Sequence, residues 1–251
     1  MPARPRTSLR SAARGLALTV AALALAGCGG SAGLAPPTGI DELQVPTSSP
    51  DPRDFVAAVD NPWLPLAQGS TWTYDIATGA TDPRPAKAVA EVLAEPAEVA
   101  GVATTQVRTV VTDASGTTLR TEVASYAQDS RGNVWLFGRH TEAGGRITDW
   151  RAGEDGARAG LAMAAHPRVG DGYEVAAAPG VDEDRAEVIT VAATQLVGDR
   201  SYDGLLVIDT SSPLDPRSAR QWYADGTGLL LADYGTSSGT EQWTLTAHDA
   251  G

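Results

Sequence analysis

The sequence is poor in cysteine and histidine, and each scarcity excludes a kind of structure. Cys28 is the only cysteine among 251 residues, so no internal disulfide can form and the fold must depend on burial. The three histidines, His140, His166 and His248, lie far apart and show neither the His-x-His nor the His-Glu-x-x-His spacing of zinc sites. We therefore expect no metal site and no cofactor.

Positive charge is also scarce. Lys87 is the only lysine, and the net charge is −12 at pH 7. Residues 1–27 carry four arginines and no acid, so the rest of the chain has 15 basic and 31 acidic residues, a net charge of −16. So acidic a surface repels nucleic-acid phosphates and anionic lipid headgroups. We expect no nucleic-acid partner and no electrostatic binding to membranes.

Long apolar runs are missing except near the N-terminus. Residues 15–26 are almost wholly apolar and follow four arginines, none of them in a twin-arginine pair. A run of about 12 residues is too short to span a bilayer as a helix, which needs about 20. A basic start followed by a short apolar run is typical of an export signal that is later removed.

The residues from Leu25 to Cys28 resemble the lipobox of bacterial lipoproteins, in which the chain is cut before the cysteine and its thiol carries a diacylglycerol. The resemblance implies a signal peptide over residues 1–27 and lipidation of Cys28. The protein would then lie on the extracytoplasmic face of the cell membrane, with the bilayer as its partner. The alternative is an ordinary signal peptide with a chance cysteine.

A tether is predicted over residues 28–50, which begin with the lipidated cysteine and are rich in Gly, Ser and Pro. A flexible segment of this length reaches about 25 Å. A single β-rich domain is predicted over residues 51–248. Asp51 and Pro52 are typical of a helix start, so we expect one short N-terminal helix, followed by a stiff strap across the domain at residues 61–66.

Short alternating runs separated by turn residues fill the rest of the chain. Apolar residues alternate in residues 72–76, 119–123 and 243–247, as in strands with one buried face. Asp, Asn and Gly between such runs are typical of hairpins. We expect ten to twelve strands in a mainly β fold, either an antiparallel β-sandwich or a strongly curved antiparallel sheet.

Two pairs of segments are faintly similar, at a spacing of about a hundred residues. Residues 68–75 are similar to residues 169–176, and residues 125–138 are similar to residues 222–235. The spacing indicates two similar β-units. We expect these units to pack face to face and to bury their aromatic residues between them.

Four segments carry a resemblance to a known family. They are NPWLPLAQGSTWTYD, YAQDSRGNVWLFGR, DWRAGEDGARAGLAMAAHPRVGDGYEV and WYADGTGLLLADYG. Over residues 54–247 the chain resembles a family of secreted or lipid-anchored bacterial proteins that are frequent in actinobacteria. The resemblance implies no established activity, cofactor or catalytic residue.

Residues 235–239 match the Gly-x-Ser-x-Gly pattern of serine hydrolases. That pattern acts where a strand turns into a helix, with an acid and a histidine further along the chain. Here a strand-like run follows, and His248 and Asp249 lie at what we expect to be a frayed terminus. We therefore predict a hairpin loop and no catalytic residue.

The densest acidic cluster is Asp182, Glu183 and Asp184 with Glu187 nearby. Carboxylate oxygens are ligands that Ca²⁺ prefers, but the alternating acidic pattern of a calcium loop is absent. A solvated turn beside a strand is the favoured interpretation, and a calcium site is the alternative.

Four residues are candidates for ligand contact. Asp129 and Asn133 flank a turn that serves either to brace a hairpin or to bind a ligand. Trp63 and Trp150 lie in loop-like contexts, where exposed rings could stack on a sugar. The other tryptophans lie in strand-like runs, where aromatic residues fill a core.

We expect the first of three functions, and the other two are its alternatives. The first is a non-enzymatic, lipid-anchored envelope protein that binds an unknown ligand or protein or has a structural role. The second is a carrier or receptor for a lipid or another apolar ligand, which requires a continuous apolar cavity of about 300 Å³ or more. The third is a hydrolase of envelope glycans, which requires two carboxylates facing each other about 5 to 10 Å apart.

Overall fold

The computed structural model describes residues 50–79, 85–236 and 239–251. The chain divides into two compact units, residues 1–36 and 37–251, and every described residue belongs to the second. The predicted signal peptide, Cys28 and the tether up to residue 49 lie outside the described residues. Among the described residues, no helix has the length and apolar character needed to cross a membrane.

The second unit is one antiparallel sheet, preceded by the 3-10 turn η1 (Pro52–Asp54). The strands along the sheet, in spatial order, are β10 (Gly172–Glu174), β11 (Arg185–Val197), β12 (Arg200–Ser212), β13 (Asp215–Ala224), β14 (Gly228–Thr236), β15 (Gly239–Asp249), β2 (Thr71–Thr78), β3 (Ala86–Val92), β5 (Val102–Asp113), β6 (Thr118–Asp129), β7 (Val134–Ala143) and β8 (Arg146–Arg151). Three short strands pair beside this path, namely β1 (Phe55–Val56) with β6, β4 (Ala97–Val99) with β5, and β9 (Gly160–Met163) with β7.

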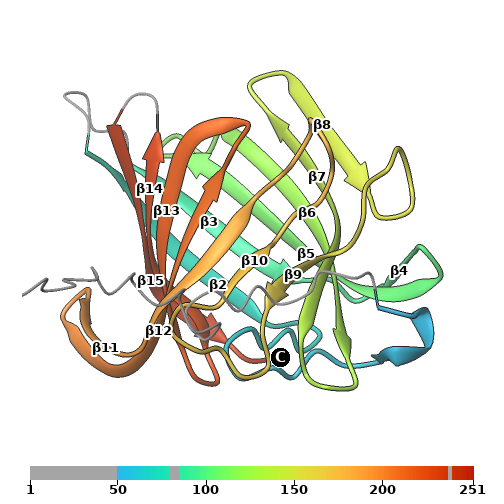
Figure 1. Cartoon of the computed structure of the whole chain (residues 1–251). Coiled ribbons are helices and arrows are strands. Elements are labelled where there is room, and N and C mark those ends of the chain that lie inside the picture. Colours follow the sequence, from blue (N-terminus) through green and yellow to red (C-terminus); the bar gives the residue numbers. More distant parts are fainter. Residues whose placement is uncertain (1–49, 80–84, 237–238) are drawn as a thin grey trace, which may run out of the picture. The chain divides into compact units, whose positions relative to one another are not determined.

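The sheet is strongly curved, so that its two ends approach each other. Figure 1 shows the green strands β5 to β7 and the orange strands β12 and β13 as opposite walls, with β9 and β10 crossing between them. Ala177 and Arg158 form a bridge between these crossing segments, and Gly160 lies so close to Val175 that any side chain there would collide with its carbonyl. The curved antiparallel sheet confirms one of the two predicted architectures, and the sandwich is not formed.

The internal similarity in the sequence corresponds to two successive meanders. The strands β2, β3, β5, β6 and β7 form the first, and β10 to β14 form the second. Residues 68–75 and 169–176 contribute the first strand of each meander, while residues 125–138 and 222–235 contribute the last two. The predicted units are therefore joined edge to edge through β15, which pairs with both β14 and β2. They do not form two stacked sheets.

The pairing registers place one end of each strand pair β2/β3, β5/β6, β7/β8, β12/β13 and β14/β15, where the first strand ends and the second begins, at the same end of the sheet, which we call the open end. At the opposite end, the strap end, residues 59–66 cross beneath the curved sheet. Asn61 is buried there and donates from Nδ2 to the carbonyls of Gly132 and Ala164, and Gly226 donates its backbone N–H to the Pro62 carbonyl. The predicted strap therefore closes one end.

The N-terminal helix is shorter than predicted. Asp51 accepts from the backbone N–H of Arg53, as an N-cap does, but η1 has only three residues and β1 follows at once. Phe55 pairs with Phe137 at a ring-centroid distance of 5.0 Å. A helix of this length is marginal without tertiary support. Packing of the Phe55 ring and the pairing of β1 with β6 instead hold the segment in an extended conformation.

The C-terminus is also more ordered than expected. β15 continues to Asp249, which pairs with Thr71, and the His248 ring stacks on Trp72 at 5.1 Å between centroids. The last strand of the chain therefore completes the sheet beside the first strand of the first meander. This long-range pairing removes the fraying that the sequence position alone suggests.

The main hydrophobic core lies inside the curve. Trp72, Tyr74 and Ile76 on β2 are all buried, as the alternation predicts. On β6, however, Leu119 is 48% exposed, and the residues that face inward include Arg120 and Glu122. The apolar alternation therefore identified the strand correctly but assigned the wrong face to the interior, because the interior is polar near the open end.

Candidate functional site

A cavity of about 340 Å³ lies inside the curved sheet. Near the strap end its wall is mostly apolar and comes from the strap and from strands of both meanders. The apolar residues there include Leu64, Leu66, Trp72, Leu136, Ala162 and Leu229. The interior of the curved sheet is therefore not completely filled by side chains.

Toward the open end the wall becomes polar. Arg120, Glu122, Arg139 and Asp184 line the cavity and also line a wider hollow of about 650 Å³. The two hollows share these residues, so they adjoin. The inner surface is thus graded from apolar at the strap end to charged at the open end, which suits a molecule with an apolar body and a polar head.

Three tyrosines line the cavity at different depths between the strap end and the open end. Tyr126, Tyr223 and Tyr234 line it and are only half-buried by surface area, yet burial raises the pKa of all three hydroxyls, that of Tyr126 to about 12. The accessible surface of these rings faces the cavity. Their hydroxyls stay protonated at neutral pH and can donate hydrogen bonds into the cavity.

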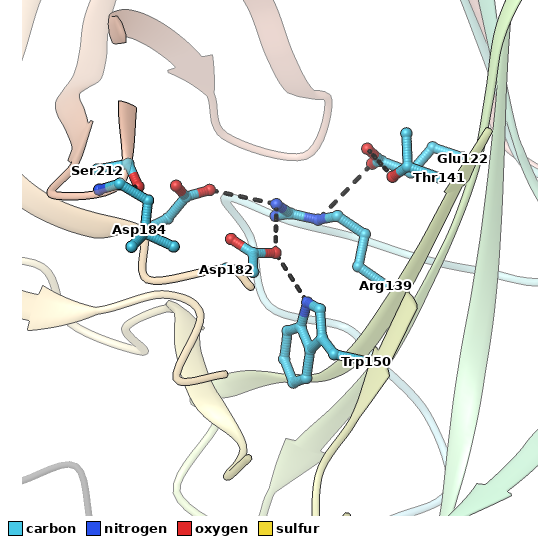
Figure 2. Close-up of polar contacts among 8 residues, drawn as sticks. Glu122, Arg139, Thr141, Trp150, Asp182, Asp184 and Ser212 are labelled. Atoms are coloured by element: carbon cyan, nitrogen blue, oxygen red, sulfur yellow. Dashed lines mark hydrogen bonds and ion pairs between the residues drawn. The ribbon is translucent and has the colours of Figure 1, made fainter. Parts of the chain in front are cut away.

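An ion-pair network joins the two ends of the sheet beside the cavity (Figure 2). Arg139 on β7 places Nη1 2.9 Å from Asp182 Oδ2 and 3.2 Å from Asp184 Oδ2, both in the segment before β11. Its Nε lies 4.0 Å from Glu122 Oε1 and forms no hydrogen bond with any described residue. Trp150 on β8 donates from Nε1 to Asp182 Oδ2 at 2.8 Å.

The electrostatics of this network follow from burial and charge. Burial disfavours the Arg139 cation, but the surrounding carboxylates, Glu122 first, outweigh it and raise its pKa. Burial raises the pKa of Asp182, while Arg139 and the Trp150 hydrogen bond oppose that rise. Arg139 therefore stays charged, and its Nη1 is held by the carboxylates of Asp182 and Asp184.

A second arginine has a different environment. The Arg120 guanidinium carbon lies 5.3 Å from the ring centroid of Trp243, in cation–π geometry. Trp243 in turn packs against Tyr74 and Tyr234, with ring centroids 5.6 Å apart in both pairs. Arg120 thus caps an aromatic wall of the cavity near the open end.

The four predicted contact residues do not converge on the cavity. Trp150 lies in β8, is 5% exposed and anchors Asp182, so its loop-like sequence context was misleading. Asp129 is buried and accepts from Arg131 N–H and from Asn133 N–H and Nδ2, which makes it a brace for its turn. Trp63 lines a separate, shallow groove on the strap.

The cavity residues Arg120, Arg139, Tyr126, Tyr223 and Tyr234 were not identified from the sequence. Their positions in alternating runs gave no signal, because a strand pattern shows which residues share a face but not whether that face encloses a void. The closing contacts also join distant positions, as Arg139 and Asp182 are 43 residues apart.

The other motifs have simple structural explanations. The predicted solvated turn is wrong for part of the acidic cluster, because Asp182 is buried and pairs with Arg139, as does Asp184. Glu183 accepts from the Gly180 N–H. Among the described residues, no group of three or more His, Cys, Asp or Glu side chains is placed to hold a metal ion. The Gly-x-Ser-x-Gly motif joins β14 to β15, and its residues 237 and 238 lie outside the described residues.

No protein-family model and no curated protein match the chain. Three solved bacterial structures are similar to it, each with a TM-score of 0.40. A Bacteroides fragilis protein, described as exported with a YmcC-like fold, is 12% identical over 75% of this chain and 99% of that one. A Parabacteroides distasonis protein described as a lipoprotein is 11% identical, over 74% and 98%. A Brucella abortus protein described as β-barrel-like, from a domain of unknown function, is 12% identical over 74% and 98%. The affiliation to an actinobacterial family stays a prediction from the sequence motifs.

Proposed function

We propose that this protein is an exported, Cys28-anchored carrier or receptor that holds an amphipathic small molecule inside its curved sheet without transforming it. The observation that carries the proposal is the cavity of about 340 Å³, graded from apolar to polar along its axis. Its volume exceeds the roughly 300 Å³ at which small-molecule sites begin. The anchor rests on the sequence signal alone.

A chain-like apolar body fits the strap end of the cavity. Trp72 and Leu229 line that end, and the Trp72 indole N–H is already satisfied by the Thr227 carbonyl at 2.7 Å. Tyr74 likewise donates its hydroxyl to the Leu229 carbonyl. The polar atoms of the floor are thus paired within the protein, which leaves an apolar surface for a methylene chain.

A binding role is also favoured over hydrolysis by the way the carboxylates are used. Glu122 and Asp184 line the cavity, but both pair with Arg139. A glycan hydrolase needs one carboxyl group as a free acid and another as a nucleophile or base. Here the buried acid with a raised pKa, Asp182, is held by Trp150 and Arg139.

Binding of saturated fatty acids of increasing length tests the proposal. In the full chain carrying Cys28→Ala no lipid can be attached at residue 28, and calorimetry measures Kd. Each buried methylene contributes about 0.8 kcal/mol, so affinity should rise about fourfold per methylene until the cavity is full and then level off. The absence of saturable 1:1 binding would contradict the proposal, as would release of sugars from envelope glycans.

A filled-cavity variant provides the matched control. Ala162 on β9 faces the cavity, so Ala162→Phe places a ring in the hollow and should abolish binding while the protein stays folded. Ala103 on β5 is exposed, and Ala103→Phe should leave binding unchanged. Equal binding by both variants would place the ligand outside the cavity.

A further inference from the structure

We infer that the ligand carries an anionic headgroup, a carboxylate or a phosphate, and that Arg120 is the residue that selects it. The inference rests on the proposed function, because it deepens the description of the same cavity. It depends on the contrast between the two arginines that line the cavity wall.

The charge of Arg139 is already balanced within the protein, although its Nε–H has no hydrogen-bond partner among the described residues. Its guanidinium lies between 2.9 and 4.0 Å from carboxylate oxygens of Asp182, Asp184 and Glu122. A ligand anion at Arg139 would be repelled by these three carboxylates. The network is therefore a fixed part of the wall that joins β7 to the segment before β11.

Arg120 makes no ion pair with any of the described residues, and its one specific contact there is the Trp243 ring. Contact with the ring face holds the guanidinium in place, while its N–H groups donate to none of the residues that the structure describes. The side chain is half-buried at the boundary between the cavity and the wider hollow. A planar guanidinium with available N–H donors at such a position matches a carboxylate or a phosphate in geometry and charge.

The position of Arg120 also fits the polarity gradient. It is the third residue of β6, at the open end, whereas Trp72 is the second residue of β2, at the strap end. A chain with its methyl end near Trp72 therefore brings its headgroup toward Arg120. Tyr234 lies beside this path and supplies a neutral polar contact.

The neighbouring carboxylate of Glu122 does not take the place of a ligand anion at Arg120. Glu122 is two residues from Arg120 on β6, but it pairs with Arg139 and accepts from Thr141 Oγ1 at 3.4 Å. The excess of acidic residues at the open end would by itself favour a cationic head. The test therefore has to compare heads of both signs on one chain.

Four ligands with twelve-carbon chains distinguish a preference for an anionic head from a preference for a neutral or cationic one. They are dodecanoate, dodecyl phosphate, dodecanol and dodecylamine, and their binding is measured with the full-length protein carrying Cys28→Ala. We expect the two anions to bind about 10 to 100 times more tightly than the alcohol, and the amine to bind most weakly. The tighter of the two anions indicates whether the natural head is a carboxylate or a phosphate. Binding of the amine as tight as that of the acid would overturn the inference.

Substitutions of Arg120 test whether this residue causes the preference for anionic ligands. Arg120→Gln should weaken dodecanoate about 10-fold to 100-fold and change dodecanol less than about threefold, and Arg120→Lys should recover part of the loss. Arg108→Gln is the matched control, because Arg108 lies on the exposed face of β5 and pairs with Glu91. Equal loss of acid and alcohol in Arg120→Gln would overturn the inference and leave the proposed carrier intact. Failure of all four ligands to bind would instead overturn the proposed function.

Discussion

The Arg139 guanidinium lies 2.9 Å from Asp182 Oδ2, although the two residues are 43 positions apart and belong to opposite ends of the sheet. The contact joins β7 of the first meander to the segment that leads into β11 of the second. Because Asp182 also accepts from Trp150, one carboxylate connects three parts of the wall. The network thus holds the sheet in the curvature that encloses the cavity.

Removal of the cation from this network should be costly. Arg139→Met leaves the carboxylates of Glu122, Asp182 and Asp184 without their partner, so we expect a loss of about 3 to 5 kcal/mol in the free energy of unfolding. Urea denaturation measures the loss. Arg220→Met is the control, because its bidentate pair with Asp209 is exposed and should be worth about 1 kcal/mol or less. Equal losses would show that the network does not hold the wall.

Tyr173 carries a buried hydroxyl with no hydrogen-bond partner among the described residues. Tyr173→Phe removes this unsatisfied group, so stability should stay equal or rise by up to about 1 kcal/mol. Tyr74→Phe should instead cost about 1 kcal/mol, because the Tyr74 hydroxyl donates to the Leu229 carbonyl. Thermal unfolding of the two variants provides the comparison. A clear loss in Tyr173→Phe would mean that its hydroxyl has a partner.

Asp129 should act as a structural residue and not as a ligand contact. Asp129→Ala leaves the N–H groups of Arg131 and Asn133 and the indole N–H of Trp135 without an acceptor, which should cost about 2 to 4 kcal/mol. Asp113 braces an exposed turn in the same way, so Asp113→Ala should cost less. Dodecanoate affinity should be unchanged in both. Weaker binding at constant stability in Asp129→Ala would restore it as a site residue.

The sequence predicts the strands and turns well because these depend on local alternation and on turn residues. Trp72, Tyr74 and Ile76 are an example, since all three are buried on one face of β2. The curvature, the pairing of β15 with β2 and the Arg139 network depend on residues far apart in the chain. No local pattern contains that information, so the cavity and its arginines became visible only in the structure.

His140 provides a prediction on pH. Its side chain lies between Glu142 and Asp149, at 3.1 and 3.0 Å, and hydrogen bonds to both, Glu142 first, raise its pKa above 6.5. Because the folded pKa exceeds the unfolded one, the stability gained is fully present below about pH 6.5 and is lost as pH rises through the folded pKa. NMR titration of the ring should show the raised pKa, and Glu142→Gln should lower it. A wild-type pKa at or below 6.5 would contradict the geometry.

The most direct test of the central claim is an NMR measurement of contacts between isotope-labelled dodecanoate and the full chain carrying Cys28→Ala. The structure predicts nuclear Overhauser effects from the terminal methyl group to the Trp72 and Leu229 side chains, which line the strap end of the cavity. A bound chain whose contacts fall only on exposed residues such as Ile147 or Leu196 would show that the interior of the sheet is not the binding site.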